Sequence, residues 1–409
     1  MFYKVEYNEN SCAALWNIEL FLLHIIGLKS VKKAFDDDKY QRAWIQEIVI
    51  IIVNITVFLV GIYSCSVTLG IVGYEDISVA AETVALILST TMCMLKGVVL
   101  TLSHRQLFDV LRELHILWKE AKTRKNLGLR IGEIINSSKP VRYWYASAAM
   151  SVGLSYMLRP YFKLLVHFMK NNNSTFDYST TSYAVEYPFP HNSFLTYTFC
   201  IIFEQWESYW GCLYSASCDT IFIQLSTHIC IHLLVLSSDY SMEFPNDENK
   251  YAYYNTELVI SLTKRHRHIL ELCNQVERLF NPIIFCTILF NGLDLCCCIF
   301  AVDQEISQGQ WPKFARSVAH AITLMIQIVI YCDYAHRVTE MTKMIAMSIY
   351  NSPWIDSDKN VQKLLMISMM RANEEYKFSA YGILVLDREQ MTRIFKTTGS
   401  YVTLLRSFS

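Results

Sequence analysis

The sequence is poor in charge and lacks the usual motifs of enzymes. Charged residues make up 18% of the 409 residues, hydrophobic residues make up 53%, and the formal net charge is −1. No C-x-x-C pair, no His-Glu-x-x-His motif and no glycine-rich phosphate loop occurs, so neither a metal site nor a nucleotide site is signalled. With a net charge this close to zero, the protein has no strong positive electrostatic potential, so nothing indicates that it binds nucleic acid. We therefore expect an all-α membrane protein that is not an enzyme and uses no cofactor.

Disulfides and a cleavable leader are also not expected. The 13 cysteines are scattered through apolar runs, as in the Cys296, Cys297, Cys298 triplet, and are interpreted as small buried hydrophobes. Acidic residues precede the apolar run 20–28, which excludes a typical signal peptide and favours an amphipathic helix on the membrane surface.

Hydrophobic residues gather in seven stretches that can each cross a bilayer as a helix. The stretches are residues 48–65, 77–100, 141–162, 194–236, 280–302, 314–332 and 388–409. The fourth is far longer than a bilayer requires, so its inner part is expected to project into the cytoplasm. Amphipathic patterns at 107–118, 269–279 and 361–370 predict further helices next to the membrane.

Charge in the loops predicts the orientation. Basic residues outnumber acidic ones in 103–142, so this loop is expected inside, which places the N-terminus in the cytoplasm and the C-terminus outside. Segment 163–193 is then extracellular, and its sequons at Asn172 and Asn173 are candidate glycosylation sites. The expected divisions are a cytoplasmic segment (1–45), spans one to four with the ligand-binding bundle (46–236), a cytoplasmic loop and anchor helix (237–280), spans five and six (281–335), cytoplasmic anchor helices (336–386) and the final span (387–409).

The final span is amphipathic, and Asp387 with Gln390 reads as a capping box at its start. One side carries Arg393, Thr397, Ser400, Leu404 and Ser407. The opposite side carries Met391, Ile394, Thr398, Val402, Leu405 and Phe408. A ring of Leu404 side chains from several subunits would close a pore by dewetting. Packing of the same stripe against a neighbouring helix is the alternative interpretation.

Several stretches resemble insect odorant receptors. Residues 394–408, IFKTTGSYVTLLRSF, are similar to the family ending ILKTSYSYFTLLRSF. Further similar text occurs at 219–222, 265–282, 350–354 and 369–372. The chain departs from the family at Gly399 and Val402, where Ser and Phe are commoner, and the glycine adds flexibility below the predicted gate.

The resemblance implies a subunit of an odorant-gated, non-selective cation channel in the plasma membrane, expected on the dendrite of an olfactory neuron. The chain looks like a ligand-specific tuning subunit, because it is short for the co-receptor and lacks that protein's long second intracellular loop. Its implied partners are the co-receptor in a heterotetramer, a small volatile ligand, permeating cations and membrane lipid. The last helix is expected to line the pore. Leu404 is its expected gate and Ser407 a polar narrow position, and the other pore-lining residues are Thr397, Ser400 and Thr403.

Family receptors bind ligand in the outer half of the bundle, and depth alone nominates candidate contacts. These are Leu86, Ile87, Gly153, Tyr156, Met157, Tyr197, Ile201, Glu204, Ile322 and Met325. For each of them ordinary packing is the favoured alternative, because depth and not a motif selected it. Among the acids inside spans, Asp219 is expected to have a structural hydrogen-bond role, and Glu204 either anchors ligand or ties two helices together.

Two other receptor classes remain as alternatives. A gustatory-type receptor channel working as a homotetramer shares the topology but usually ends in a Thr-Tyr and Gln-Phe pattern, which is absent here. A G-protein-coupled receptor is disfavoured by the cytoplasmic N-terminus that the basic loops predict.

Overall fold

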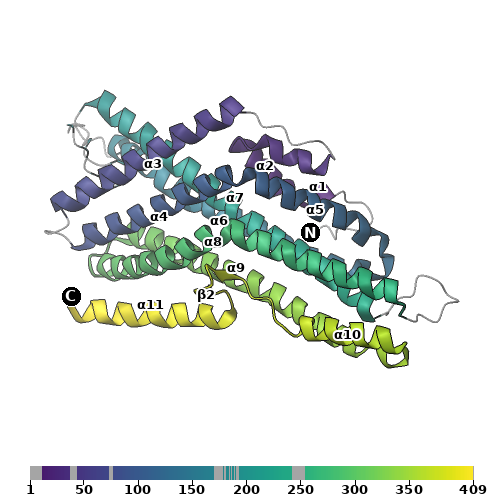
Figure 1. Ribbon diagram of the computed structural model, residues 1–409. Helices are drawn as coiled ribbons and strands as arrows, with labels where there is room; N and C mark the ends of the chain where they lie inside the picture. Colours follow the sequence, from purple (N-terminus) through teal and green to yellow (C-terminus); the bar gives the residue numbers. More distant parts are fainter. Residues whose placement is uncertain are drawn as a thin grey trace.

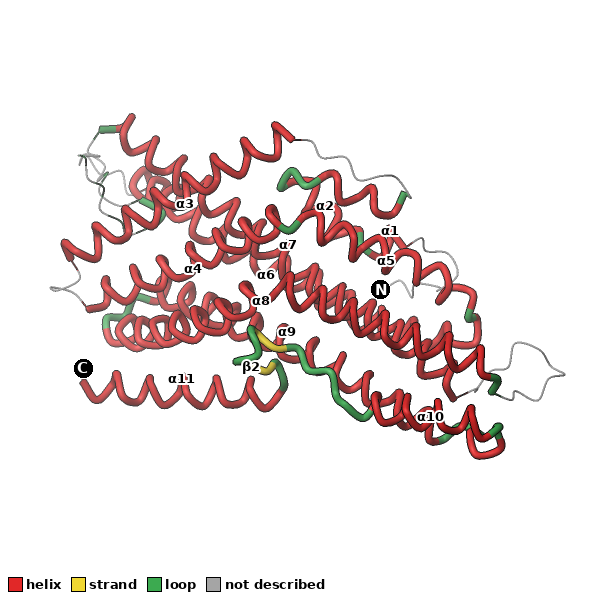
Figure 2. The backbone as a smooth tube through the Cα atoms, in the orientation of Figure 1, coloured by secondary structure: helices red, strands yellow, loops and turns green. Residues whose placement is uncertain are grey.

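The computed structural model describes residues 12–36, 44–72, 77–169, 193–241 and 254–408, with positions 178, 181–183, 185, 187 and 189 between them. In these residues the chain is helical almost throughout, apart from one short hairpin (Figure 2). This confirms the predicted all-α fold. Asn172 and Asn173, the candidate glycosylation sites, lie outside the described residues.

The helices of the first half follow one another through short connections. They are α1 (Cys12–Leu15), α2 (Asn17–Ile25), η1 (Lys29–Phe35), α3 (Trp44–Val72), α4 (Ile77–Leu102), α5 (His104–Thr123), η2 (Lys125–Leu127) and α6 (Gly128–Met169). Those of the second half are α7 (Phe194–Ser241), α8 (Thr256–Ser307), α9 (Trp311–Tyr350), η3 (Trp354–Asp356), α10 (Lys359–Ala372) and α11 (Arg388–Phe408). A hairpin of β1 (Ser379–Ala380) and β2 (Leu384–Val385) precedes α11.

A helix is present at each of the seven predicted spans: α3, α4, α6, α7, α8, α9 and α11. Among the described residues, α3, α4, α7, α8 and α9 are long and apolar enough to cross a membrane by themselves. The other two are more polar: α6 contains Arg142 and Arg159, and α11 carries Arg393 and Lys396. A helix of this kind is stable in a membrane when its polar side faces protein or water.

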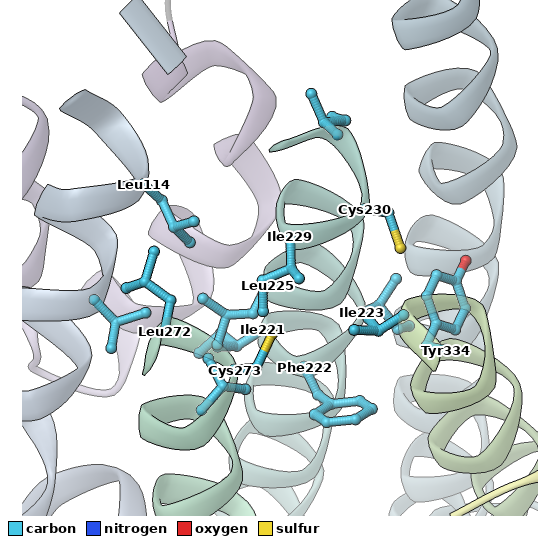
Figure 3. Close-up of a cluster of buried hydrophobic side chains, with 14 of the residues drawn as sticks. Leu114, Ile221, Phe222, Ile223, Leu225, Ile229, Cys230, Leu272, Cys273 and Tyr334 are labelled. Carbon is cyan, nitrogen blue, oxygen red and sulfur yellow. The ribbon is translucent and has the colours of Figure 1, made fainter. Parts of the chain in front are cut away.

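Helix α7 is the centre of the fold. It packs against α2, α3, α4, α5, α6, α8 and α9, and its most apolar 18-residue window is entirely buried. Figure 3 shows Ile221, Leu225 and Ile229 of α7 among apolar side chains of its neighbours, such as Leu272 of α8. Such a helix is apolar all round because every side of it meets another helix.

The two ends of the bundle differ in what lies beside them. Helix α11 runs along α8 and α9 at one end, while α5 and α10 lie at the other (Figure 1). Helix α8 continues through Pro282 as one 52-residue helix, although its pattern changes there from amphipathic to apolar. The amphipathic helices predicted next to the membrane are thus present, and α8 and α9 connect the two ends.

The start of α11 has a defined cap. The Asp387 carboxylate accepts a hydrogen bond from the Gln390 backbone N–H at 2.7 Å, which is the N-cap half of the predicted capping box. The hairpin before it was not anticipated from the sequence. In the turn of the hairpin, Gly382 has φ +69°, a conformation that glycine adopts without steric cost. Leu386, which follows the hairpin, is fully buried.

Candidate functional site

A cavity of about 190 Å³ lies between helices α4, α6, α7, α8 and α9. It is near the α8–α9 turn, in the half of the bundle that α11 borders. Most of its wall is apolar or aromatic: Phe58, Ala85, Leu86, Met92, Ala149, Val152, Tyr156, Tyr183 and Leu324. An apolar cavity with few polar groups is the usual form of a small-molecule site.

Three of the residues nominated by depth line this cavity: Leu86, Gly153 and Tyr156. Gly153 allows α6 and α7 to approach closely, because a Cβ at this position would overlap the Cys212 sulfur. The Tyr156 ring lies at the rim, where the Arg316 guanidinium stacks on it 4.8 Å from the ring centroid. Arg316 also pairs with Glu82 at 3.0 Å, so α4, α6 and α9 meet at this rim.

Seven nominated residues are not part of the cavity wall: Ile87, Met157, Tyr197, Ile201, Glu204, Ile322 and Met325. Ile322 and Met325 are 51% and 40% exposed on the outer side of α9, whereas His320 and Leu324 of the same helix face inward. Depth in a span says nothing about angular position, and one residue turns a helix by about 100°. This is why the nomination by depth placed only some residues at the cavity.

Among the described residues, the hydrogen-bond partners of Glu204 lie in the loop between α6 and α7, and Glu204 does not line the cavity. Its carboxylate accepts hydrogen bonds from the Thr181 hydroxyl at 2.5 Å, the Ser182 N–H at 2.7 Å and the Tyr187 hydroxyl at 2.9 Å. Burial and this carboxylate together raise the pKa of Tyr187 well above its ordinary value, which keeps the phenol a donor. Glu204 therefore fixes the α6–α7 loop on α7, and the loop in turn places Tyr183 in the cavity wall.

Asp219 is the centre of a polar network at one end of the cavity. It pairs with Lys96 of α4 at 2.7 Å and accepts hydrogen bonds from Gln327 and Tyr331 of α9, each at 2.6 Å, and from Tyr145 of α6. The carboxylate and ammonium groups are both fully buried. Four helices thus converge on one carboxylate, which has the structural role predicted for it. Asn291 extends the network to α8 by donating to Gln327 at 2.5 Å.

A second polar group lies further along the same two helices, where α8 and α9 meet. Ser89 donates to the Asp294 carboxylate at 2.6 Å, and His320 Nε2 lies 3.6 Å from the same carboxylate. Cys298, one turn after Asp294 on α8, has its sulfur 3.7 Å from His320 Nδ1. The spacing of Asp294 and Cys298 is visible in the sequence, but nothing in it indicates that His320 joins them.

The described part of α11 agrees with its amphipathic pattern. Thr397 and Ser400 are exposed in the isolated chain, while Thr398 is buried against the bundle. The backbone is helical through Phe408. The side chains of Thr403, Leu404 and Ser407 lie outside the described residues.

Together these features define a class of protein, a helical membrane protein with an internal, mostly apolar cavity. The chain matches the 7tm Odorant receptor family over residues 76–399, which is most of its length, and it belongs to this family. The family consists of receptors, as expected from a sequence without enzyme motifs.

Individual relatives show distant similarity. The chain is 26% identical to Odorant receptor 47a of Drosophila melanogaster over 54% of this chain and 57% of that protein. It is 28% identical to Odorant receptor 10 of Aedes albopictus over 39% of this chain and 41% of that protein. The chain thus spans about half the length of these two curated relatives.

The fold is also that of a solved insect receptor. The insect olfactory receptor OR5 from Machilis hrabei, in complex with eugenol, superposes with a TM-score of 0.78 at 14% identity. The superposition covers 99% of this chain and all of that chain. It includes the short N-terminal helices, so the whole described architecture is shared.

Proposed function

We propose that this protein is the odorant-binding subunit of a ligand-gated, non-selective cation channel in the plasma membrane of insect olfactory neurons. The observation that carries the proposal is the internal cavity, whose surface is mostly apolar but also includes polar side chains such as Glu82, Glu207 and Gln327. Volatile molecules have little hydrogen-bonding capacity, so they bind mainly by apolar burial, at about 25 cal/mol per Å². Leu86, Gly153 and Tyr156 are the nominated contacts that this cavity supports. The solved structure of OR5 from Machilis hrabei contains eugenol, a small aromatic molecule, and this supports a small volatile ligand for the present cavity.

We assign the pore to α11 and the partner to the co-receptor. Thr397 and Ser400 present hydroxyls on a side of α11 that the chain itself leaves exposed, which suits a water-filled pore between subunits. The order of residues then places Leu404 at the gate, with Thr403 and Ser407 beside it. In the described part of the chain, α11 packs mainly against α8 and α9, so a heterotetramer with the co-receptor would enclose its other side. In this assembly the C-terminus is extracellular.

Whole-cell current tests the proposal directly. The chain is expressed with and without an insect co-receptor and exposed to a panel of volatile molecules, with G-protein signalling blocked. Current that requires both the co-receptor and a ligand is expected. Ligand-gated current from this chain alone would instead indicate a homomeric channel of the gustatory type. Loss of the current under G-protein blockade would overturn the channel assignment.

A pair of tyrosine variants locates the ligand. Tyr156→Ala removes part of the cavity wall and should shift the half-maximal concentration upward without altering ion selectivity. Tyr161→Ala is the matched control, because Tyr161 lies on the same helix with its ring 51% exposed. Equal behaviour of the two variants would remove Tyr156 from the site.

A further inference from the structure

We propose that Asp294, Cys298 and His320 form a zinc site in the cavity wall, and that its open coordination position takes volatile ligands with a sulfur or nitrogen donor. The metal site stands on geometry alone, whereas the ligand class rests on the proposed function. One carboxylate, one thiol and one imidazole are all established ligands of Zn²⁺. The three residues come from two adjacent helices, α8 and α9.

The ligand atoms are spaced for a single ion. One donor atom from each residue lies within 4.8 Å of the other two. Asp294 Oδ1 and the Cys298 sulfur are 3.5 Å apart, and the Cys298 sulfur and His320 Nδ1 are 3.7 Å apart. In a tetrahedral site with Zn–S near 2.3 Å and Zn–N or Zn–O near 2.0 Å, neighbouring ligand atoms are about 3.3–3.5 Å apart. His320 turns Nδ1 toward the Cys298 sulfur and Nε2 toward Asp294, at 3.6 Å from Oδ2, so the imidazole must rotate to bring one nitrogen to an ion shared with both.

Charge also favours a divalent ion at this place. Asp294 is almost completely buried, and an uncompensated carboxylate inside a membrane protein is costly. Zinc binding releases the Cys298 thiol proton to solvent, because a coordinating thiol is deprotonated. The ion, the carboxylate, the thiolate and the neutral imidazole then sum to zero charge. A neutral cluster suits the apolar wall better than a free carboxylate.

The surroundings supply an outer layer and an open side. The Ser89 hydroxyl donates to Asp294 Oδ2 at 2.6 Å and so orients the carboxylate. Such outer hydrogen bonds hold metal ligands in position and affect metal affinity. Ser89, Cys298 and His320 all line the cavity. Three protein ligands leave the fourth position of zinc open, and because Cys298 and His320 line the cavity, a ligand in the cavity could reach it.

The preferred ligand follows from the metal. A thiol, an amine or a nitrogen heterocycle coordinates zinc through sulfur or nitrogen, whereas an alcohol or an ester of the same shape offers a weaker oxygen donor. The cavity therefore selects for the donor atom at one wall and for apolar shape elsewhere. Without metal, the same residues form only a hydrogen-bonded cluster, and this selectivity would be absent.

Cobalt binding tests the metal site independently of channel activity. The purified full-length chain in lipid nanodiscs is titrated with Co²⁺, and the cobalt–thiolate charge-transfer band and its loss on Zn²⁺ addition are recorded. Wild type should bind one Co²⁺ with this band, and Cys298→Ser and His320→Gln should lack it. Ser89→Ala should retain the band with about 10–100-fold weaker affinity. Thermal melting of each variant separates lost ligands from lost folding.

Neighbouring cysteines provide the matched controls. Cys297 and Cys212 also line the cavity but are outside the cluster, so Cys297→Ser and Cys212→Ser should bind cobalt as wild type does. If Cys298→Ser misfolds, Asp294→Asn and His320→Gln decide the result. Absence of the band in wild type, or a band that persists in every folded cluster variant, would overturn the proposal.

The ligand class has its own measurement. Currents are compared for a thiol and the alcohol with the same carbon skeleton, before and after a membrane-permeant zinc chelator. A response to the thiol that falls at least tenfold after chelation, with the alcohol response unchanged, is expected. If cobalt binds but the chelator changes neither response, the ligand class is wrong and the metal site stands. Silence toward every ligand, with cobalt bound, would count against the proposed function instead.

Discussion

Asp219 shows how one buried charge is made tolerable inside a membrane protein. Its carboxylate receives an ammonium group from Lys96 and hydrogen bonds from Tyr145, Gln327 and Tyr331. A buried pair costs desolvation on both sides, and this cost is offset only when the remaining lone pairs are also satisfied. In this protein the lone pairs of Asp219 are satisfied by residues of three other helices.

Asp219→Asn should destabilise the receptor by about 3–5 kcal/mol, because it leaves the Lys96 ammonium buried without a counter-charge. The expected observation is a lower thermal midpoint of the purified protein and less of it at the cell surface. A double variant, Asp219→Asn with Lys96→Met, removes the stranded charge and should recover much of the loss. If the single variant melts like wild type, Lys96 has another way to be neutralised and the interpretation of this network is wrong.

Residue roles were predictable from the sequence only in part. An acid in an apolar span must have partners, so a structural role for Asp219 could be expected, but not that the partners are Lys96 and Tyr331. The function of Glu204 was missed because its partners lie in a loop without periodic pattern. Asn54 of α3 is 2% exposed and accepts a hydrogen bond from Trp206 at 3.0 Å, a partner that the sequence did not indicate. Side-chain partners depend on helix rotation, which hydropathy does not report.

At the level of elements, hydropathy and capping predicted the helices but not the strands or the packing. The seven predicted spans are helices, and α11 begins immediately after the predicted cap residue, Asp387. The amphipathic patterns correctly predicted α5 and α10. The β1–β2 hairpin was not predicted, because two-residue strands leave no periodic signal. The packing of α7 against seven other helices was also out of reach, since an apolar helix looks the same whether lipid or protein surrounds it.

Helix α11 has an exposed hydroxyl side, and this leads to a prediction for its gate. Leu404→Ala should raise ligand-independent current, because a smaller apolar side chain widens the constriction and allows it to stay wet. The measurement is basal current per receptor at the cell surface, with co-receptor present. Leu405→Ala is the matched control, since the helical pattern puts Leu405 on the opposite side. Equal basal current in wild type and Leu404→Ala would count against Leu404 as the gate.

At the level of the whole molecule, helix α9 connects the cavity to α11, because it carries polar contacts to both. Gln327 lines the cavity and binds Asp219, which also accepts from Tyr331 at 2.6 Å. Two residues further along α9, Asp333 binds Arg388 at the first turn of α11 at 2.7 Å. Any ligand that moves α9 relative to the bundle therefore also moves the start of α11. A shared rigid helix is a physical route for coupling two sites.

Arg388→Gln should weaken this coupling. The pair is two-pronged, with Arg388 Nε at 3.0 Å and Nη2 at 2.7 Å from Asp333 Oδ1, but the arginine is 58% exposed, so about 1 kcal/mol is at stake. That corresponds to about a fivefold smaller shift of the open–closed equilibrium by ligand. The expected result is a lower maximal current at saturating ligand, with ligand affinity measured by direct binding nearly unchanged. Arg393→Gln is the control, because Arg393 pairs with Glu389 of the same helix at 2.8 Å and does not reach α9. If both variants reduce the current equally, the effect comes from charge on α11 and not from its contact with Asp333.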